Sequence, residues 1–229
     1  MKSQKMTHEA RFLCAAAHGN EAEVRAMLAK GVAVDVRDGK GRTALMLAAG
    51  AGSCDIVRLL LDSGADATAR NNGNRPVIDY VQHPAVARAI LGAMPMLERA
   101  TAATRLLFQC GVSVQCLQVA LEYGAQVNAR NRRGDTALHV HAYSGSAACV
   151  QFLLAAGALP DEKNCHGKTP LLIAIWLAYA DVAQLLVDAG ADVYTRDAKG
   201  RTLDYLTRCN CAACKECIAV LDRVRMTSR

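Results

Sequence analysis

The sequence predicts an all-α solenoid of stacked helix–turn–helix repeats joined by short β-hairpin loops. The first sign is a glycine that recurs every 33 residues, at Gly134, Gly167 and Gly200. The second is a threonine two positions after each of these glycines, at Thr136, Thr169 and Thr202. The third is a pair of short apolar segments between successive glycines, each with the composition of a helix.

The stretch 134–164 shows how one repeat is built. Thr136 can cap a helix through its side-chain oxygen, and we expect that helix over 137–144, ended by Gly145. A second helix is expected over 147–156. It stops at Gly157, because glycine readily takes the backbone conformation that follows a helix. An extended, polar return then leads to the next repeat.

A 33-residue unit of a β-turn and two helices with a T-x-L core resembles the ankyrin repeat. The resemblance is carried by TALH (136–139), TPLL (169–172) and the GAD triplets (64–66 and 190–192), and it extends over nearly the whole chain. It implies a single repeat domain, 1–229, in which each repeat packs only on its neighbours. The approximate repeats are 6–38, 39–72, 73–93, 94–131, 132–164, 165–198 and 199–229.

The repeats differ in regularity. The first and the seventh have charged outer faces that suit terminal caps, and the second, fifth and sixth are regular. In the third, Asn74 takes the glycine place, the second helix is short and begins at Pro84, and the proline after Met94 directs that residue away from helix. Gly41 and Gly134 are 93 residues apart where three repeats would need 99, so we expect a compressed third repeat or a local change of twist. Helices over 100–110 and 115–123 are expected in the fourth.

Composition limits the class of protein. The 229 residues are 52% hydrophobic but only 4% aromatic, which fits a core of Ala, Leu and Val between short helices. A net charge of +6 is mild and does not demand a nucleic-acid partner. The N-terminal segment lacks the apolar core of a signal peptide, and no apolar run reaches the length of a membrane span. We expect a cytoplasmic protein, with the nucleus as the alternative.

The chain holds ten cysteines. Cys116, Cys149 and Cys217 fall at apolar positions one turn into a second helix, and Cys14 matches the apolar position that Leu47 holds later. Most cysteines are therefore expected to be buried and reduced.

Four cysteines also form a C-x-C-x2-C-x2-C cluster, at Cys209, Cys211, Cys214 and Cys217. Four thiolates could bind zinc tetrahedrally. However, Cys217 aligns with a core position, and the spacing is tighter than in zinc ribbons. The main expectation is no cofactor and a cysteine-rich helix–turn–helix, with zinc or a redox-sensitive cluster as alternatives.

Catalytic motifs are missing from the sequence. It contains no P-loop, dinucleotide-binding glycine pattern, nucleophile elbow or HExxH motif, so we expect a non-catalytic protein. His139 and His141 would lie roughly 200° apart on one helix and cannot share a ligand. The resemblance assigns His139 a bond to the backbone of the adjoining turn, whereas His141 replaces an alanine; a structural role is expected for both. It also places Asn128 where some relatives are hydroxylated, but we expect its side chain to bond to turn backbone.

In the ankyrin family the hairpin tips and the inner face of the first helices contact protein partners. The tips here are mostly basic: Arg37, Lys40, Arg42, Arg70, Arg75, Arg130, Arg132, Arg133, Lys163, Lys168, Arg196, Lys199 and Arg201. The fewer acidic residues are Asp38, Asp135, Glu162 and Asp197. Aligned along one edge of the solenoid, the tips would form a basic ridge.

On the inner face, Tyr143 and Ser144 match Trp176 and Leu177 of the next repeat. The only Trp of the chain, beside a Tyr at the same phase, resembles a binding hot spot. Solvated tips and a Trp that merely packs between repeats form the alternative interpretation. The predicted partner-binding residues are Arg130, Arg132, Arg133, Tyr143, Ser144, Lys168, Trp176, Leu177 and Arg201.

These features predict a monomeric scaffold or adaptor that binds another protein, with an acidic segment of the partner complementing the ridge. Two alternatives come from other classes of protein. One is a zinc- or redox-responsive module that uses the cysteine cluster. The other is a nucleic-acid binder that uses the ridge, which the near-absence of aromatic residues among the arginines disfavours.

Overall fold

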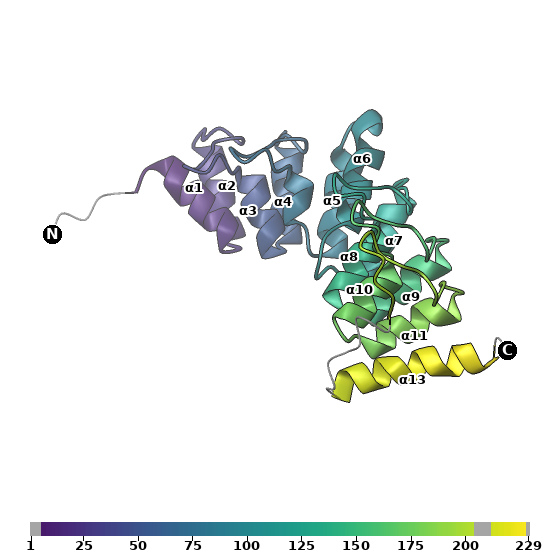
Figure 1. The fold of residues 1–229 in the computed structure, drawn as a ribbon. Helices are drawn as coiled ribbons and strands as arrows, with labels where there is room; N and C mark the ends of the chain where they lie inside the picture. The colour runs from purple at the N-terminus through teal and green to yellow at the C-terminus, as the bar shows by residue number, and fades with distance from the viewer. Residues whose placement is uncertain (1–5, 204–211, 228–229) are drawn as a thin grey trace. The chain divides into compact units, whose positions relative to one another are not determined.

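The structure is a computed structural model that describes residues 6–203 and 212–227 (Figure 1). These residues form helices joined by turns and hairpin loops. Strand pairing within them is limited to isolated antiparallel bridges between Arg37 and Thr43, Arg70 and Pro76, and Arg196 and Thr202. The predicted all-α fold with short hairpins is therefore confirmed. No helix of this described part is long and apolar enough to cross a bilayer.

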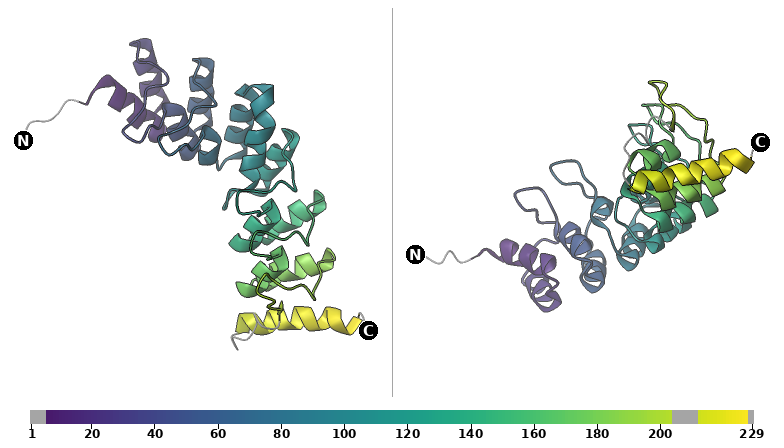
Figure 2. Two further views of the ribbon diagram at one scale, coloured as in Figure 1. Left: turned by 45° about the horizontal axis from the view of Figure 1, so that its top comes forward. Right: turned by 60° about the horizontal axis from the view of Figure 1, so that its bottom comes forward.

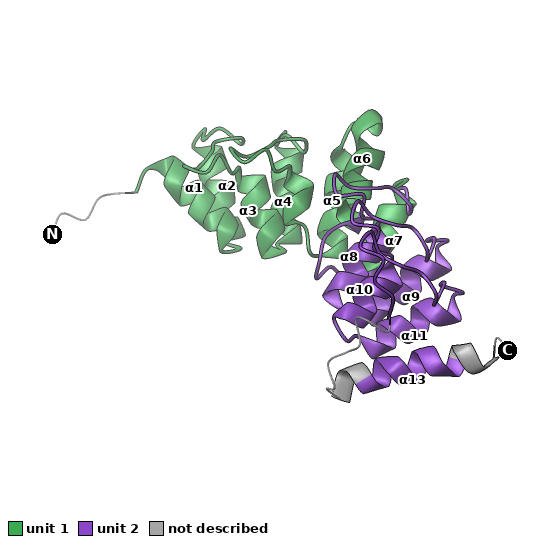
Figure 3. Cartoon of the chain, in the orientation of Figure 1, with its two compact units in different colours: residues 1–106, 115–125 green, residues 107–114, 126–229 purple. Residues whose placement is uncertain are grey.

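The chain divides into two compact units (Figure 3). Unit 1 comprises residues 1–106 and 115–125, and unit 2 comprises residues 107–114 and 126–229. The division falls inside the irregular fourth repeat. The single repeat domain and the repeat boundaries expected from the sequence stay predictions.

Unit 1 contains the helix pairs of the first three repeats and most of the fourth. These are α1 (His8–Ala17), α2 (Glu21–Ala29), α3 (Ala44–Ala51), α4 (Cys54–Asp62), the 3-10 helix η1 (Val77–Tyr80), α5 (Pro84–Ala93), α6 (Met96–Leu107) and α7 (Val114–Glu122). The first helices α1, α3 and η1 pack in sequence, as do the second helices α2, α4 and α5. Each pair therefore buries its apolar sides against the next pair.

Threonine caps fix where the first helices begin. Thr43 Oγ1 accepts a hydrogen bond from the N–H of Met46 at 3.3 Å, and Thr169 Oγ1 accepts one from Leu172 at 3.3 Å. Both threonines are fully buried. The repeated threonine thus satisfies a helix-end N–H that would otherwise be buried without a partner.

The third repeat is shortened, in agreement with the compression expected from the sequence. Pro76 replaces the capping threonine, no side chain caps the helix that follows, and only the four-residue η1 forms. Helix α5 begins eight positions after Pro76, whereas α4 begins eleven positions after Thr43. Asn74 takes the glycine place with φ 59, and Met94 is extended, both as predicted. The helix expected over 100–110 is wrong at both ends: α6 begins at Met96, directly after Pro95, and ends at Leu107.

Unit 2 contains α8 (Ala137–Ser144), α9 (Ala147–Ala155), α10 (Pro170–Trp176), α11 (Ala180–Asp188) and α13 (Ala212–Thr227). The bounds of α8 are those predicted, and α9 ends one residue earlier than predicted. The first helices α8 and α10 pack together, as do the second helices α9 and α11, and α13 covers α11 at the end of the stack (Figure 2). Every residue of α10 before Trp176 is buried.

The prediction for the cysteines holds in part. Cys116, Cys149 and Cys217 are buried in second helices, as predicted. The prediction is wrong for Cys14, which is exposed; the matching Leu47 is itself only half-buried. Cys110 and Cys165 are also exposed, so the expectation that most cysteines are buried is wrong for those the structure describes.

The recurring glycines let successive hairpins touch. At Gly167, φ is +69 and an added Cβ would lie 2.6 Å from the backbone nitrogen of Ala198 in the next hairpin. That nitrogen donates to the carbonyl of His166 at 3.2 Å, and the nitrogen of Cys165 bonds in the same way to Arg133 one repeat earlier, at 3.0 Å. Glycine therefore recurs every 33 residues for two reasons: the turn requires a positive φ, and the backbone of the next hairpin lies too close for a Cβ.

We expect Gly167→Ala to destabilise unit 2 more than Gly157→Ala. Both glycines have positive φ, which costs alanine roughly 1–2 kcal/mol. An added Cβ at Gly157 meets nothing within 4 Å, whereas at Gly167 it meets the backbone of the next hairpin, adding about 1–3 kcal/mol. Urea unfolding followed by circular dichroism and by Trp176 fluorescence measures both changes. Equal losses in the two variants would contradict the role given to hairpin contact.

Candidate functional site

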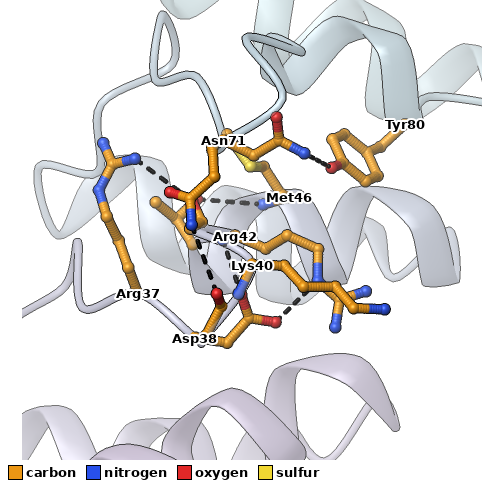
Figure 4. Close-up of polar contacts among 11 residues, drawn as sticks. Arg37, Asp38, Lys40, Arg42, Met46, Asn71 and Tyr80 are labelled. Atoms are coloured by element: carbon orange, nitrogen blue, oxygen red, sulfur yellow. Dashed lines mark hydrogen bonds and ion pairs between the residues drawn. The ribbon is translucent and has the colours of Figure 1, made fainter.

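Several hairpin cations of unit 1 are bonded within the protein (Figure 4). Arg42 forms an ion pair with Asp38 at 2.7 Å, and the same carboxylate accepts from the N–H groups of Lys40 at 2.9 Å and Arg42 at 2.8 Å. Arg37 donates to a carbonyl of its own hairpin and to the carbonyl of Arg70 in the next one. Burial of Asp38 would raise the pKa of its carboxyl, but the bonds from Arg42 and Lys40 outweigh burial and lower it.

The hairpins of unit 2 use their cations in the same way. Arg201 pairs with Asp197 at 2.6 Å, and Arg130 pairs with Glu162 in the next hairpin. Arg130 also donates to the carbonyl of Lys163 at 2.8 Å, and Lys163 Nζ donates in turn to a carbonyl of the following hairpin at 3.2 Å. Arg130 and Arg201, both predicted to bind a partner, thus form ion pairs within the protein. Arg130 joins two successive hairpins, and Arg201 pairs within its own hairpin.

Arg132 and Arg133 differ from these bonded cations. Both are exposed at the tip of their hairpin, where the Arg133 N–H bonds to Asn131 Oδ1 at 2.8 Å. Among the residues with described side chains, no carboxylate forms an ion pair with either guanidinium. These two guanidiniums therefore contribute charge to the predicted ridge that no described carboxylate compensates.

Tyr143 and Trp176, which hold the same position in adjacent repeats, contact each other on unit 2. Their ring centroids are 6.2 Å apart and the ring planes cross at 81°, an edge-to-face pair. Tyr143 is 45% exposed and Trp176 is 48% exposed, although the rest of α10 is buried. Two large aromatic side chains, one from α8 and one from α10, thus remain open to solvent.

Lys168 extends this aromatic pair. Its Nζ lies 4.1 Å from the centroid of the Trp176 ring, within the range of a cation–π contact. The backbone of Lys168 is fixed, because its N–H bonds to Asn164 Oδ1 at 3.1 Å and its carbonyl bonds to His139 Nε2 at 3.0 Å. Lys168 was predicted as a tip residue, but its contact with Trp176 could not be read from sequence spacing.

Ser144 and Leu177, the other two inner-face residues, serve the helix ends. Ser144 Oγ donates to the carbonyl of His141 at 3.1 Å, and Leu177 is the half-buried C-terminal cap of α10. Ala178 follows with φ 60, in the place that Gly145 holds one repeat earlier. Tyr179 was not among the predicted residues; its exposed ring lies 2.8 Å from where a Cβ on Gly145 would be. The sequence could have indicated it, because Tyr179 takes the place that Ser146 holds in the previous repeat.

His139 joins the cap of α8 to the hairpin of Lys168. It is fully buried; the Thr136 N–H donates to its Nδ1 at 3.1 Å, and its Nε2 bonds to the Lys168 carbonyl. The bond to the adjoining turn that the resemblance implied is confirmed. Burial lowers the pKa of His139, and the Lys168 carbonyl and the Asp135 carboxylate oppose that shift only in part.

His141 is buried on the same helix but has different partners. Its Nε2 bonds to the carbonyl of Leu107 at 3.1 Å, and its Nδ1 is buried without a hydrogen-bond partner. Burial lowers the pKa of His141, against a smaller raising effect of the Leu107 carbonyl. The two histidines thus bond to different backbone carbonyls, and both have structural roles.

Asn128 also has the structural role expected for it. Its Nδ2 donates to the carbonyl of Gly157 at 3.1 Å, and its Oδ1 accepts from the N–H of Leu159 at 3.0 Å. The side chain thus connects two consecutive repeats.

The proposed zinc ligands cannot be assessed as a set. Cys209 and Cys211 lie outside the described residues, and the side chain of Cys214 is likewise not described. Cys217 is buried in α13. Within the part that is described, no group of three or more His, Cys, Asp or Glu residues could hold a metal ion. Zinc binding by this cluster stays a prediction.

Comparison with known proteins agrees with this architecture. A model of the family "Ankyrin repeats (3 copies)" matches residues 3–71 and 104–197. The chain belongs to the ankyrin-repeat family. No curated protein sequence matches it significantly.

Solved structures show the same fold. The human ASB11 ankyrin-repeat domain aligns with a TM-score of 0.80 and 20% identity, over 91% of this chain and 96% of that one. The ankyrin-repeat domain of Bcl-3, a member of the IκB family, aligns with a TM-score of 0.69 and 22% identity, over 96% and 100%. At these identities the likeness concerns the fold alone.

We expect the stability of unit 2 to fall as the pH drops below about 6.5, the ordinary pKa of histidine. The folded chain keeps His139 and His141 neutral, so below that pH the unfolded chain binds protons that the folded chain does not. Urea unfolding between pH 8 and pH 5 measures the slope. His139→Gln should reduce it, because glutamine at this position can still bond to the Thr136 N–H.

His166→Gln, which removes an exposed imidazole from the same unit, is the matched control. A free energy of unfolding that stays constant over this pH range would contradict the assignment of neutral buried imidazoles.

Proposed function

We propose that this ankyrin-repeat protein is a non-catalytic scaffold or adaptor that binds another protein on unit 2. The observation that carries the proposal is the exposed edge-to-face pair of Tyr143 and Trp176. Leaving two half-exposed aromatic rings in water is unfavourable, and a partner that covers them recovers that free energy. Trp and Tyr are also the residue types that most often dominate binding energy at interfaces.

The surroundings of the aromatic pair support a protein interface. Helix α10 is otherwise buried, so Trp176 is presented by a rigid element and loses little freedom on binding. The exposed guanidiniums of Arg132 and Arg133 lie one hairpin earlier and would supply a polar rim that attracts acidic partners. An apolar centre with a charged rim is the usual composition of such surfaces.

The alternative functions receive no comparable support. A nucleic-acid binder would need several cations facing phosphates, but Arg130, Lys163 and Arg201 already bond to carboxylates or carbonyls of the hairpins. A zinc- or redox-responsive module would depend on a cysteine cluster that lies largely outside the described residues.

We expect Trp176→Ala and Tyr143→Ala each to weaken partner binding at least about tenfold, the scale of a hot-spot residue. Tyr194→Ala is the matched control, because Tyr194 is a 63% exposed aromatic residue of the same unit outside the pair. Affinity purification from cell extract with each variant, quantified by mass spectrometry, identifies proteins whose recovery depends on the pair. Circular dichroism confirms folding. Undiminished recovery of every partner by both folded variants would refute the proposal.

A further inference from the structure

We infer that the bound partner segment places a carboxylate on Lys168, directly beside an apolar side chain that covers Tyr143 and Trp176. This inference rests on the proposed function and specifies the chemistry of the segment bound there. It assigns acid recognition to one lysine next to the aromatic pair, rather than to the row of hairpin arginines.

Two hairpins equivalent to that of Lys168 pair their cation with an acid of the same hairpin. The residue before the repeat threonine is Arg42 in the second repeat and Arg201 in the seventh. Each forms an ion pair with an aspartate four residues earlier, Asp38 at 2.7 Å and Asp197 at 2.6 Å. In these hairpins the fold itself supplies a carboxylate for the cation.

The sixth repeat lacks this carboxylate, as does the third, where Asn71 takes the aspartate place and Arg75 lies over the Tyr80 ring. Asn164 stands in the aspartate place, and its Oδ1 accepts from the N–H groups of His166 at 3.0 Å and Lys168 at 3.1 Å. These are the turn bonds that Asp38 and Asp197 make, so the hairpin shape is kept while the negative charge is missing. Lys168 forms no ion pair among the residues with described side chains.

The neighbouring acid does not take over this role. Asp135 holds in the fifth repeat the place that Lys168 holds in the sixth. It accepts hydrogen bonds from Asn164 Nδ2 at 2.8 Å and from Asn131 Nδ2 at 3.4 Å. Glu162 is paired with Arg130. The Lys168 ammonium instead lies over the Trp176 ring, 4.1 Å from its centroid.

A carboxylate is a better partner for this ammonium than the ring is. An exposed cation–π contact is worth about 0.5–1 kcal/mol, whereas a charge-assisted hydrogen bond sheltered by bound apolar groups is stronger. Because the lysine backbone is held by His139 and Asn164, only the side chain must adjust. The ammonium and the two rings are adjacent, so the acidic and apolar groups of the partner must be adjacent as well.

A protein segment fits this site better than a nucleic acid does. Binding to a phosphate backbone uses many cations at once. Here Arg130, Lys163 and Arg201 already bond to carboxylates or carbonyls of the hairpins. One uncompensated lysine beside two exposed rings matches one acidic and one apolar side chain.

Selection of displayed random twelve-residue peptides on the full chain tests the inference. We expect enrichment of peptides with Asp or Glu within one to three positions of a large apolar residue. A synthetic selected peptide should bind about five- to tenfold tighter than its Asn or Gln version, measured by Trp176 fluorescence and calorimetry. Lys168→Gln should lower the affinity by a similar factor and abolish the difference between the two peptides.

Lys199→Gln, which removes an exposed cation from the next hairpin, is the matched control and should leave both affinities unchanged. An acidic peptide that binds Lys168→Gln as tightly as the wild type would overturn the inference. Selection of purely apolar peptides that still need Trp176 would overturn it and leave the proposed function standing. Failure to select any Trp176-dependent peptide would count against both. Displacement of the peptide by a twelve-nucleotide single-stranded DNA would overturn it in favour of a nucleic-acid ligand.

Discussion

The structure depends on contacts between hairpins of successive repeats. No helix pair has enough apolar surface of its own to be stable, so each must lie against the next at a fixed distance. Side chains set that distance: Asp35, Asn128 and Asp161 each accept from a backbone N–H 31 residues later. Backbone bonds between successive hairpin tips, each joining residues 32 positions apart, form where glycine allows close approach. The helices are thus aligned by polar contacts at their edge as well as by their apolar faces.

The same constraint determines which hairpin cations remain available for a partner. A lysine or arginine whose side chain fastens the next hairpin, such as Arg37, Arg130 or Lys163, cannot leave its carbonyl without weakening the stack. Basic residues in hairpins are therefore mostly part of the fold. A cation is informative about binding only where the expected acid is missing, and Asn164 creates that situation for Lys168.

Sequence periodicity predicted most of the fold because glycine, threonine and apolar residues recur for local reasons. It gave the bounds of α8 and the shared phase of Tyr143 and Trp176. It could not give η1, because the loss of a helical turn after Pro76 depends on how few residues remain before α5. It was wrong for Cys14, since this position of a first helix is not fully buried even in the second repeat, where Leu47 is half-buried. The Lys168–Trp176 contact depends on side-chain conformation, which spacing does not encode.

His139 connects the stability of the stack to the geometry of the site. One imidazole nitrogen completes the cap of α8, the helix that carries Tyr143, and the other holds the backbone of Lys168. The buried residues of α10 hold Trp176 in turn. The two rings and the ammonium are therefore positioned by the same contacts that stack the repeats. A surface arranged in this way before binding pays less conformational entropy when a partner docks, so a small aromatic pair can supply a large share of the affinity.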